Sequence, residues 1–236
     1  ARPVGQAATL AARRRTESAE SDQVLVWALR DEVELEQLGE WDAMGMRGTC
    51  SPPFRIAVDV SATNVLDSPF GTIASHRMVP WSHLLWASCW EGIASSAFDK
   101  AVRASRKKAR KQLAAGNEFG EPRLADAHSQ LQALRAILDE FGAVYAEQAA
   151  LAPDWRSADK ARVLTADAMS LKLNASMMSF RVAELALEII GMPGYSESAP
   201  LSVTRNLRDL MGARLQVSNE RLRHTAGQVL LAGGDL

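Results

Sequence analysis

Residues 122–151, with the sequence PRLADAHSQLQALRAILDEFGAVYAEQAAL, decide the fold that this chain is predicted to have. Apolar and aromatic side chains recur there in alternating steps of three and four positions, which places them on one face of a helix. They are Leu124, Ala127, Leu131, Leu134, Leu138, Phe141 and Tyr145. A seven-residue repeat of this kind lines the seam of a left-handed helical bundle, so the segment is predicted to be one helix of such a bundle.

The rest of the chain after Pro80 reads as three further long helices. They are expected near residues 81–115, 156–190 and 201–232, and the breaks between the helices contain Pro122, Pro153, Pro193 and Pro200. Proline is tolerated at a helix start, so these positions suit helix boundaries. Residues 80–236 are therefore predicted to form an antiparallel four-helix bundle.

The segment before the bundle has a different character. Residues 22–29 are apolar and bounded by polar clusters, and Phe54, Ile56, Val58 and Val60 alternate with more polar neighbours. Both patterns are typical of strands. Residues 1–20 read as a loose surface segment or a broken strand end. The predicted fold is mainly α with a partial β domain: a short antiparallel β segment over residues 1–79, followed by the bundle.

Composition argues against several classes of function. Of the 236 residues 47% are hydrophobic and 23% charged, and the formal net charge is -1, which favours neither nucleic acid nor an acidic membrane as a partner. No apolar run reaches the 18 residues of a membrane span. Cys50 and Cys89 lack the spacing of a zinc site or a disulfide framework, and we interpret them as free thiols in a reducing cytoplasm.

The last fifty residues contain an unusual series of motifs. Gly191-Met192-Pro193-Gly194-Tyr195 is followed by Pro200, by Arg205 and by the pair Arg208-Asp209, and the closing segment contains Ser218-Asn219-Glu220-Arg221-Leu222. Far upstream lies Trp41-Asp42-Ala43-Met44-Gly45-Met46-Arg47-Gly48-Thr49-Cys50-Ser51, and Met78-Val79-Pro80 follows it. In this order, the motifs resemble the end of the β domain and the C-terminal domain of the acyl-CoA dehydrogenase family.

The resemblance implies a flavoprotein of fatty acid metabolism. It implies FAD as cofactor, an acyl-CoA substrate that undergoes α,β-desaturation, and electron-transferring flavoprotein as the electron acceptor. It also implies a homo- or hetero-oligomer built through the bundle. Against the family, the chain reads as a fragment that lacks the N-terminal domain.

The family places its catalytic base, a Glu, at one of two positions. Laid over this chain without gaps, these positions fall on Val217 and on Ser82, and neither side chain is a carboxylate. Glu220 and Glu91 are the nearest carboxylates, and Glu220 is the candidate base. His83, beside Ser82, is a candidate for binding the substrate thioester.

The flavin contacts of the family are partly retained. The candidates for FAD binding are Gly191, Gly194, Asn219, Arg221 and Phe119. Elsewhere the pattern departs from the family, since Met192 stands for a glycine and Glu188 for a glutamine. A side chain in place of that glycine obstructs a close approach of the backbone to a phosphate.

Three functional interpretations remain open from the sequence. The chain belongs to an active dehydrogenase with a displaced base, to a non-catalytic subunit that pairs with an active one, or to a flavin monooxygenase. The basic run from Arg103 to Lys111 has two interpretations of its own. It is either a solvated helix end or a group that attracts the phosphates of FAD or CoA.

Overall fold

The computed structural model describes residues 6–150 and 158–232, and the chain divides into two compact units, Ala1–Met78 and Val79–Leu236. The mainly helical fold with short antiparallel strands is the predicted one. The identity of the first unit as part of an acyl-CoA dehydrogenase β domain stays a prediction. Within the described ranges, no helix has the length and apolar character needed to cross a bilayer.

The first unit contains two antiparallel strand pairs. Strand β1 (Ala7–Arg13) pairs with β2 (Gln23–Leu29), and β3 (Val33–Gln37) pairs with β4 (Phe54–Val58). The short helix α1 (Phe70–Ile73) follows them. The expected strands over residues 22–29 and 54–60 are confirmed as β2 and β4. Residues 1–20 were expected to be a loose surface segment or a broken strand end, and strand β1 lies there. Strand β3 was not expected.

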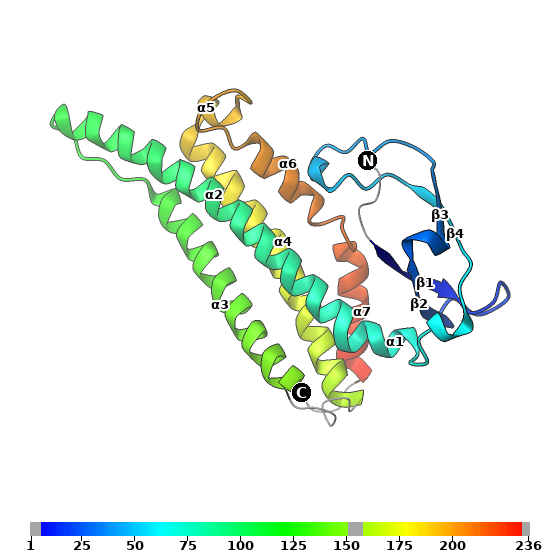
Figure 1. The fold of residues 1–236 in the computed structure, drawn as a ribbon. Coiled ribbons are helices and arrows are strands. Elements are labelled where there is room, and N and C mark those ends of the chain that lie inside the picture. Colours follow the sequence, from blue (N-terminus) through cyan, green and yellow to red (C-terminus); the bar gives the residue numbers. More distant parts are fainter. Residues whose placement is uncertain (1–5, 151–157, 233–236) are drawn as a thin grey trace. The chain divides into compact units, whose positions relative to one another are not determined.

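The second unit is built on three long helices that lie side by side (Figure 1). They are α2 (Val79–Ala114), α3 (Pro122–Ala150) and α4 (Ala158–Ile190). Helix α4 packs most extensively against α2, and α3 packs against both. The expected helix ends at residues 151 and 156 lie outside the described residues.

The heptad pattern of α3 faces the core as predicted. The side chains of Ala127, Leu131, Leu134, Phe141 and Tyr145 are buried, with at most 5% of their surface exposed. Leu134, Phe141 and Tyr145 join one large apolar cluster with residues of α2 and α4. This burial stabilises the three-helix packing, since apolar surface removed from water contributes roughly 25 cal/mol per Å².

The expected fourth helix over residues 201–232 is wrong. The structure has two helices there, α6 (Thr204–Gly212) and α7 (Asn219–Ala232), and a single-turn helix α5 (Met192–Tyr195) precedes them. Residues 213–218 connect α6 to α7, and we call this segment the α6–α7 bend. Within this bend Val217 has a left-handed φ of 48°, just before α7 begins.

Candidate functional site

The α6–α7 bend contains a strained backbone position. Val217 has a φ of 48°, although it is a β-branched residue. For an L-residue, the left-handed conformation costs roughly 1–2 kcal/mol, and it persists only where the surroundings hold it. Val217 is also the position at which the family resemblance expects the catalytic base. The contacts that hold this residue therefore matter for the site.

Lys172 of α4 supplies those contacts. Its Nζ donates one hydrogen bond of 2.8 Å to the carbonyl oxygen of Val217 and another of 2.6 Å to Oδ1 of Asn219. The same ammonium group lies 5.7 Å from the centre of the Trp90 ring. Lys172 thereby connects α4 to the bend and to the start of α7.

Lys172 is a charged side chain in the interior of the bundle. None of its surface is exposed, and it forms no ion pair with a carboxylate in the described parts of the chain. Burial, and to a smaller extent the positive charge of Arg223, lower the pKa of Lys172 to about 8. A buried lysine without a counter-charge is costly, because its ammonium has lost its hydration.

Asn219 is the first residue of α7 and is buried, with 6% of its surface exposed. Besides accepting from Lys172, it donates from Nδ2 to Oγ of Ser176 over 2.9 Å. Sequence analysis had Asn219 as a flavin contact. In this structure its side chain instead binds two residues of α4, and its visible role is to anchor α7.

The side chain of His83, from α2, also contacts helix α4. It is buried, with 3% of its surface exposed, and its Nδ1 is 3.0 Å from the carbonyl oxygen of Ala168. A carbonyl only accepts hydrogen bonds, so Nδ1 carries the hydrogen and Nε2 is the acceptor of the neutral ring. Burial lowers the pKa of His83, the hydrogen bond to Ala168 opposes this effect, and the charge of Lys172 lowers it further.

Of the two sequence positions expected for a base, one binds Lys172 directly. Val217 accepts a hydrogen bond from Lys172, whereas Ser82 donates from Oγ to the carbonyl oxygen of Val79. Hydrogen bonds join Lys172, Ser176, Val217 and Asn219, and we call these residues the Lys172 cluster.

Glu220 follows directly after this cluster, in the first turn of α7. Its side chain is 90% exposed, and its Oε2 lies 3.8 Å from an NH1 nitrogen of Arg223. An exposed pair of this kind contributes little to stability, so Glu220 is available for other contacts. The negative charge also suits the positive end of the α7 dipole.

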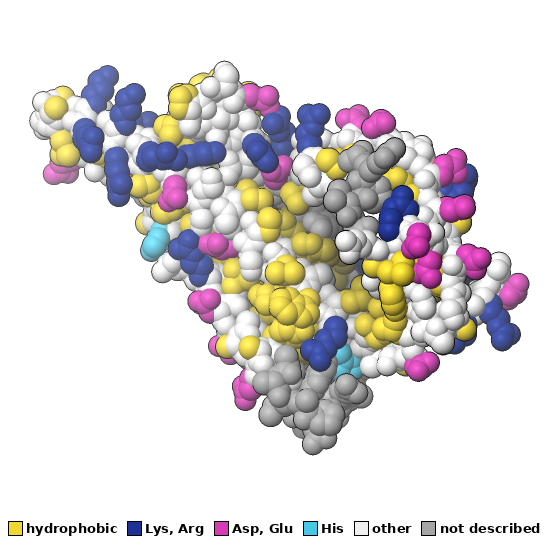
Figure 2. Space-filling view, viewed as in Figure 1, with side chains coloured by type: hydrophobic (Ala, Val, Ile, Leu, Met, Phe, Trp, Pro, Cys, Tyr) yellow, Lys and Arg dark blue, Asp and Glu magenta, His cyan; other side chains and the backbone are white. Residues whose placement is uncertain are grey.

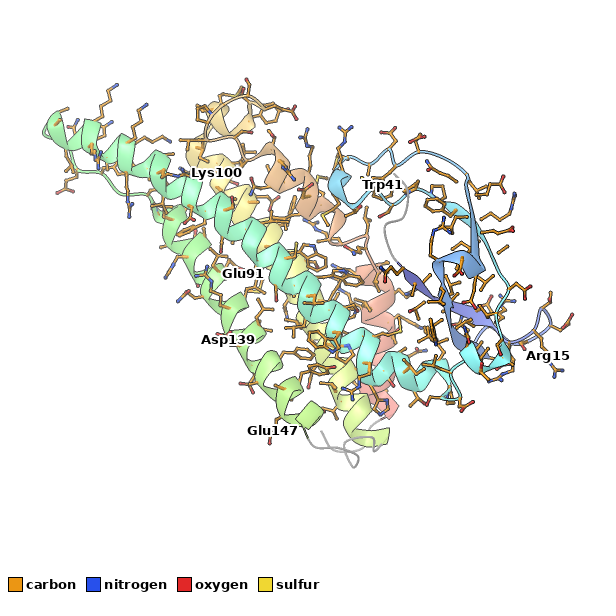
Figure 3. The ribbon with its side chains drawn as sticks, viewed as in Figure 1. Arg15, Trp41, Glu91, Lys100, Asp139 and Glu147 are labelled. Carbon is orange, nitrogen blue, oxygen red and sulfur yellow. The ribbon has the colours of Figure 1, made fainter. Side chains whose placement is uncertain are left out.

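Glu91 lies elsewhere, in a groove between α2 and α3. Its Oε1 accepts hydrogen bonds of 2.7 Å from Nε of Arg135 and of 2.7 Å from Oγ of Ser95. The lining of this groove also includes Asp139, and Figure 3 labels both acids on the two helices. Glu91 therefore forms an ion pair with Arg135, outside the Lys172 cluster.

The glycine turn before α6 uses its own amides. Gly191 has a φ of 78°, which favours glycine, and its N–H donates to the carbonyl oxygen of Leu187. The N–H of Gly194 donates to the carbonyl oxygen of Gly191. A Cβ on Gly194 would lie only 3.1 Å from Ile190, so a larger residue would force Ile190 to shift by a few tenths of an ångström. With both amides used inside the chain, Gly191 and Gly194 do not fit a phosphate-binding turn.

The two other flavin candidates keep accessible side chains. Arg221 is exposed in the first turn of α7, and Phe119 is half-buried in the connection between α2 and α3. A guanidinium group at this end of a helix fits a phosphate, because both the charge and the helix dipole attract it. Of the five predicted flavin contacts, Arg221 is the one whose chemistry and exposure suit that role best.

The basic run forms an exposed group at the end of α2, where Figure 2 shows several Lys and Arg side chains together. Lys108 donates from Nζ to the carbonyl oxygen of Ile189, near the end of α4. Further back on α2, Lys100 binds the carbonyl oxygen of Ser202 over 2.7 Å and Oδ1 of Asn206 over 2.9 Å. Two lysines of α2 thus have structural roles.

The Arg-x-x-Arg-Asp motif connects the ends of neighbouring segments. Arg205 lies 3.5 Å from Asp209 within α6, and Arg208 pairs with Glu197 in the connection from α5. The side chain of Arg205 is exposed, and that of Arg208 is half-buried. Their observed contacts are structural and local.

Sequence analysis missed Lys172 and Ser176. A signal was present, because Lys172 lies four positions after Ala168 and three before Ala175, in the apolar face of α4. A lysine inside such a face is rare in a core unless it has partners.

Comparison with known proteins agrees with the resemblance to the acyl-CoA dehydrogenase family. The sequence profile of the acyl-CoA dehydrogenase C-terminal domain matches residues 72–216. A comparison with curated protein sequences finds no match.

Three solved structures are similar in fold. Butyryl-CoA dehydrogenase from Megasphaera elsdenii is 22% identical, with a TM-score of 0.72 over 96% of this chain and 56% of that chain. KijD3, in complex with FMN and an amino-keto-sugar nucleotide, is 22% identical with a TM-score of 0.75 over 99% and 57%. Nitroalkane oxidase crystallised with 1-nitrooctane is 19% identical with a TM-score of 0.75 over 98% and 56%.

These relatives differ in the molecules that their names give, and at such identities they establish the fold alone. This chain spans a little over half of their length. The profile, in contrast, covers more than half of this chain. The chain belongs to the acyl-CoA dehydrogenase family.

Proposed function

We propose that this chain is part of a flavin-dependent oxidoreductase that desaturates an acyl-CoA thioester. The observation that carries the proposal is the geometry of the α6–α7 bend in this member of the acyl-CoA dehydrogenase family. Val217 is held there in a strained conformation by the buried Lys172, and strained backbone is typical of functional sites. Glu220 follows three residues later, with an exposed carboxylate.

Glu220 is the proposed base. Desaturation removes a proton from the α-carbon and a hydride from the β-carbon, and a carbon–carbon double bond forms. An ionised Glu220 would accept the α-proton, and its Oε2 lies 3.8 Å from the Arg223 guanidinium. His83 is the proposed contact of the thioester.

FAD is the proposed cofactor, and when bound it supplies the acceptor for the hydride. Arg221 would hold one of its phosphates, and Phe119 would contact it from the connection between α2 and α3. In this proposal Gly191 and Gly194 shape the turn before α6, and Asn219 anchors α7. Electron-transferring flavoprotein is the proposed electron acceptor, and the bundle is proposed to form a homo- or hetero-oligomer in the cytoplasm.

A second candidate function needs no base in this chain. Val217 and Ser82 occupy the two positions at which a base is expected, and neither can accept the α-proton as a carboxylate does. This observation favours a non-catalytic subunit of a heteromeric dehydrogenase, or flavin chemistry with oxygen. In either case Glu220 would have no part in proton transfer.

The substitution Glu220→Gln tests the first candidate in the whole native assembly. Gln keeps the size of the side chain and cannot accept the proton, so turnover of acyl-CoA thioesters should fall about 10²–10⁴-fold while the flavin stays bound. Glu184→Gln is the matched control, because Glu184 also pairs with an arginine three positions away, Arg181, on an exposed helix surface. Unchanged turnover in Glu220→Gln would remove Glu220 from the mechanism and favour the second candidate.

A further inference from the structure

Two lysine–asparagine pairs hold the starts of α6 and of α7 against the long helices. At the start of α6, Lys100 of α2 binds Asn206 and the carbonyl oxygen of Ser202. Beyond its end, Lys172 of α4 binds Asn219 and the carbonyl oxygen of Val217. Each ammonium therefore binds one amide side chain and one main-chain carbonyl.

The two pairs differ in what they hold. The Lys100–Asn206 pair lies at an ordinary helix start, and Asn206 also donates to the carbonyl oxygen of Ile93. The Lys172–Asn219 pair holds the strained Val217, and Lys172 is fully buried whereas Lys100 is not. The second pair thus combines backbone strain with a desolvated charge, and both cost free energy.

Stability alone accounts poorly for such a lysine. Replacement of a buried charge by an apolar residue of similar volume is often neutral or stabilising. A methionine would fill the same space beside Trp90, which belongs to the large apolar cluster. What a methionine cannot supply is the pair of donors to Val217 and Asn219.

We propose that Lys172 is a positioning residue that fixes the α6–α7 bend, and with it the first turn of α7, in the geometry that the reaction requires. Its two hydrogen bonds hold consecutive parts of the chain, the carbonyl of Val217 and the side chain of Asn219. Ser176 holds the other end of the Asn219 amide. Glu220 is the next residue, so its direction follows from this anchoring.

The inference rests on the proposed function only where it assigns the fixed geometry to proton transfer by Glu220. Lys172 itself touches neither substrate nor cofactor in this account. A purely space-filling role predicts that methionine replaces Lys172 without consequence. A positioning role predicts that loss of the two N–H donors of Lys172 changes the bend even when the volume of the side chain is kept.

The test compares wild type with Lys172→Met in the whole flavin-bound assembly, and Lys100→Met is the matched control. Amide hydrogen exchange of peptides from residues 213–222 reports the bend directly, without any need for turnover. Flavin content, kcat and KM are measured in parallel, with butanoyl-CoA and octanoyl-CoA as substrates. Two lost hydrogen bonds should raise exchange in residues 213–222 at least tenfold in Lys172→Met.

Lys100→Met should leave exchange in residues 213–222 unchanged and raise it near residues 202–207. In Lys172→Met, kcat should fall at least tenfold, with KM and flavin content within twofold of wild type. Should Lys172→Met fail to fold, Ser176→Ala carries the test, because it removes one contact of Asn219 and keeps Lys172. It should raise exchange in residues 213–222 two- to fivefold.

Wild-type exchange of residues 213–222 in Lys172→Met would overturn the inference, and so would raised exchange with an unchanged kcat. Failure of the proposed function looks different. If Glu220→Gln keeps full turnover, Glu220 is not the base. The comparison of hydrogen exchange between the lysine variants would still decide whether Lys172 fixes the bend.

Discussion

At the scale of single residues, the main finding is that Lys172 occupies a core position. Its charge is fully buried next to Trp90, and its partners are a carbonyl and an amide rather than a carboxylate. The neutral amine also has two N–H donors, enough for both acceptors. Loss of its proton therefore removes an unfavourable charge and leaves both hydrogen bonds in place.

The stability of the protein should consequently depend on pH through Lys172. Burial lowers its pKa from 10.5 to about 8, so between these values the unfolded chain binds more protons than the folded chain. Stability should rise with pH across this window, by about 3 kcal/mol in total, because each unit of pKa corresponds to about 1.4 kcal/mol. Urea unfolding of wild type and of Lys172→Met from pH 7 to pH 11 measures how the free energy of unfolding depends on pH.

The difference between the two proteins isolates the contribution of Lys172, because all other groups titrate in both. The free energy of unfolding of wild type should increase relative to Lys172→Met as the pH rises from about 8 to about 10.5. A constant difference over this range would show that Lys172 has an ordinary pKa.

The backbone of Val217 gives a second prediction at this scale. Alanine is ordinarily more stabilising than glycine in regular structure by about 1 kcal/mol, but a left-handed φ reverses the order. Val217→Gly should therefore be more stable than Val217→Ala by about 1 kcal/mol, since alanine keeps the Cβ that a left-handed φ disfavours and glycine has none. Thermal unfolding of the two variants measures the difference. A more stable alanine variant would contradict the left-handed φ of 48°.

At the scale of elements, the long helices were predictable and the connection between α6 and α7 was not. The repeat in α3 comes from burial of one face, and burial leaves a periodic pattern in the sequence. The break before α7 depends on Val217, which carries none of the glycine or asparagine chemistry that marks a left-handed residue. It is held by Lys172, 45 residues earlier in the chain.

The candidate site, too, was only partly predictable from the sequence. Motif spacing drew attention to Asn219, Glu220 and Arg221 as neighbours in the sequence. Their different environments depend on tertiary packing: Asn219 is buried against α4, whereas Glu220 and Arg221 are exposed. Strand β3 was missed for a similar reason, since its sequence VELEQ is acidic and only its pairing with β4 identifies it.

The packing of α3 provides a prediction for the element. Leu134 is fully buried, so Leu134→Asp places an unpaired charge in the core and should cost several kcal/mol. Leu113→Asp is the matched control on α2, because Leu113 is 64% exposed, and it should change stability by no more than about 0.5 kcal/mol. Circular dichroism during urea unfolding measures both. Equal stabilities of the two variants would show that the α3 face is assigned wrongly.

At the scale of the whole molecule, the two units differ in their cores. All three clusters of buried apolar side chains lie within residues 79–236. Among the described residues of the first unit, the buried apolar side chains are Val24, Leu25, Ala28 and Val33. A unit of this size with so few buried side chains gains little from the hydrophobic effect.

The two units should therefore behave differently when produced separately. Residues 79–236 alone should give a helical protein that unfolds cooperatively, because their core is complete. Residues 1–78 alone should give no cooperative transition. Thermal melts followed by circular dichroism measure both. Cooperative unfolding of residues 1–78, or its absence in residues 79–236, would contradict this division of stability.

The central claim is that this member of the acyl-CoA dehydrogenase family works as a flavoprotein, and flavin stoichiometry tests it most directly. The whole native assembly would be purified and its visible spectrum used to count flavins per chain. One flavin for each copy of this chain is the predicted result. Half a flavin or none would contradict the claim and identify the chain as the non-catalytic partner of another subunit.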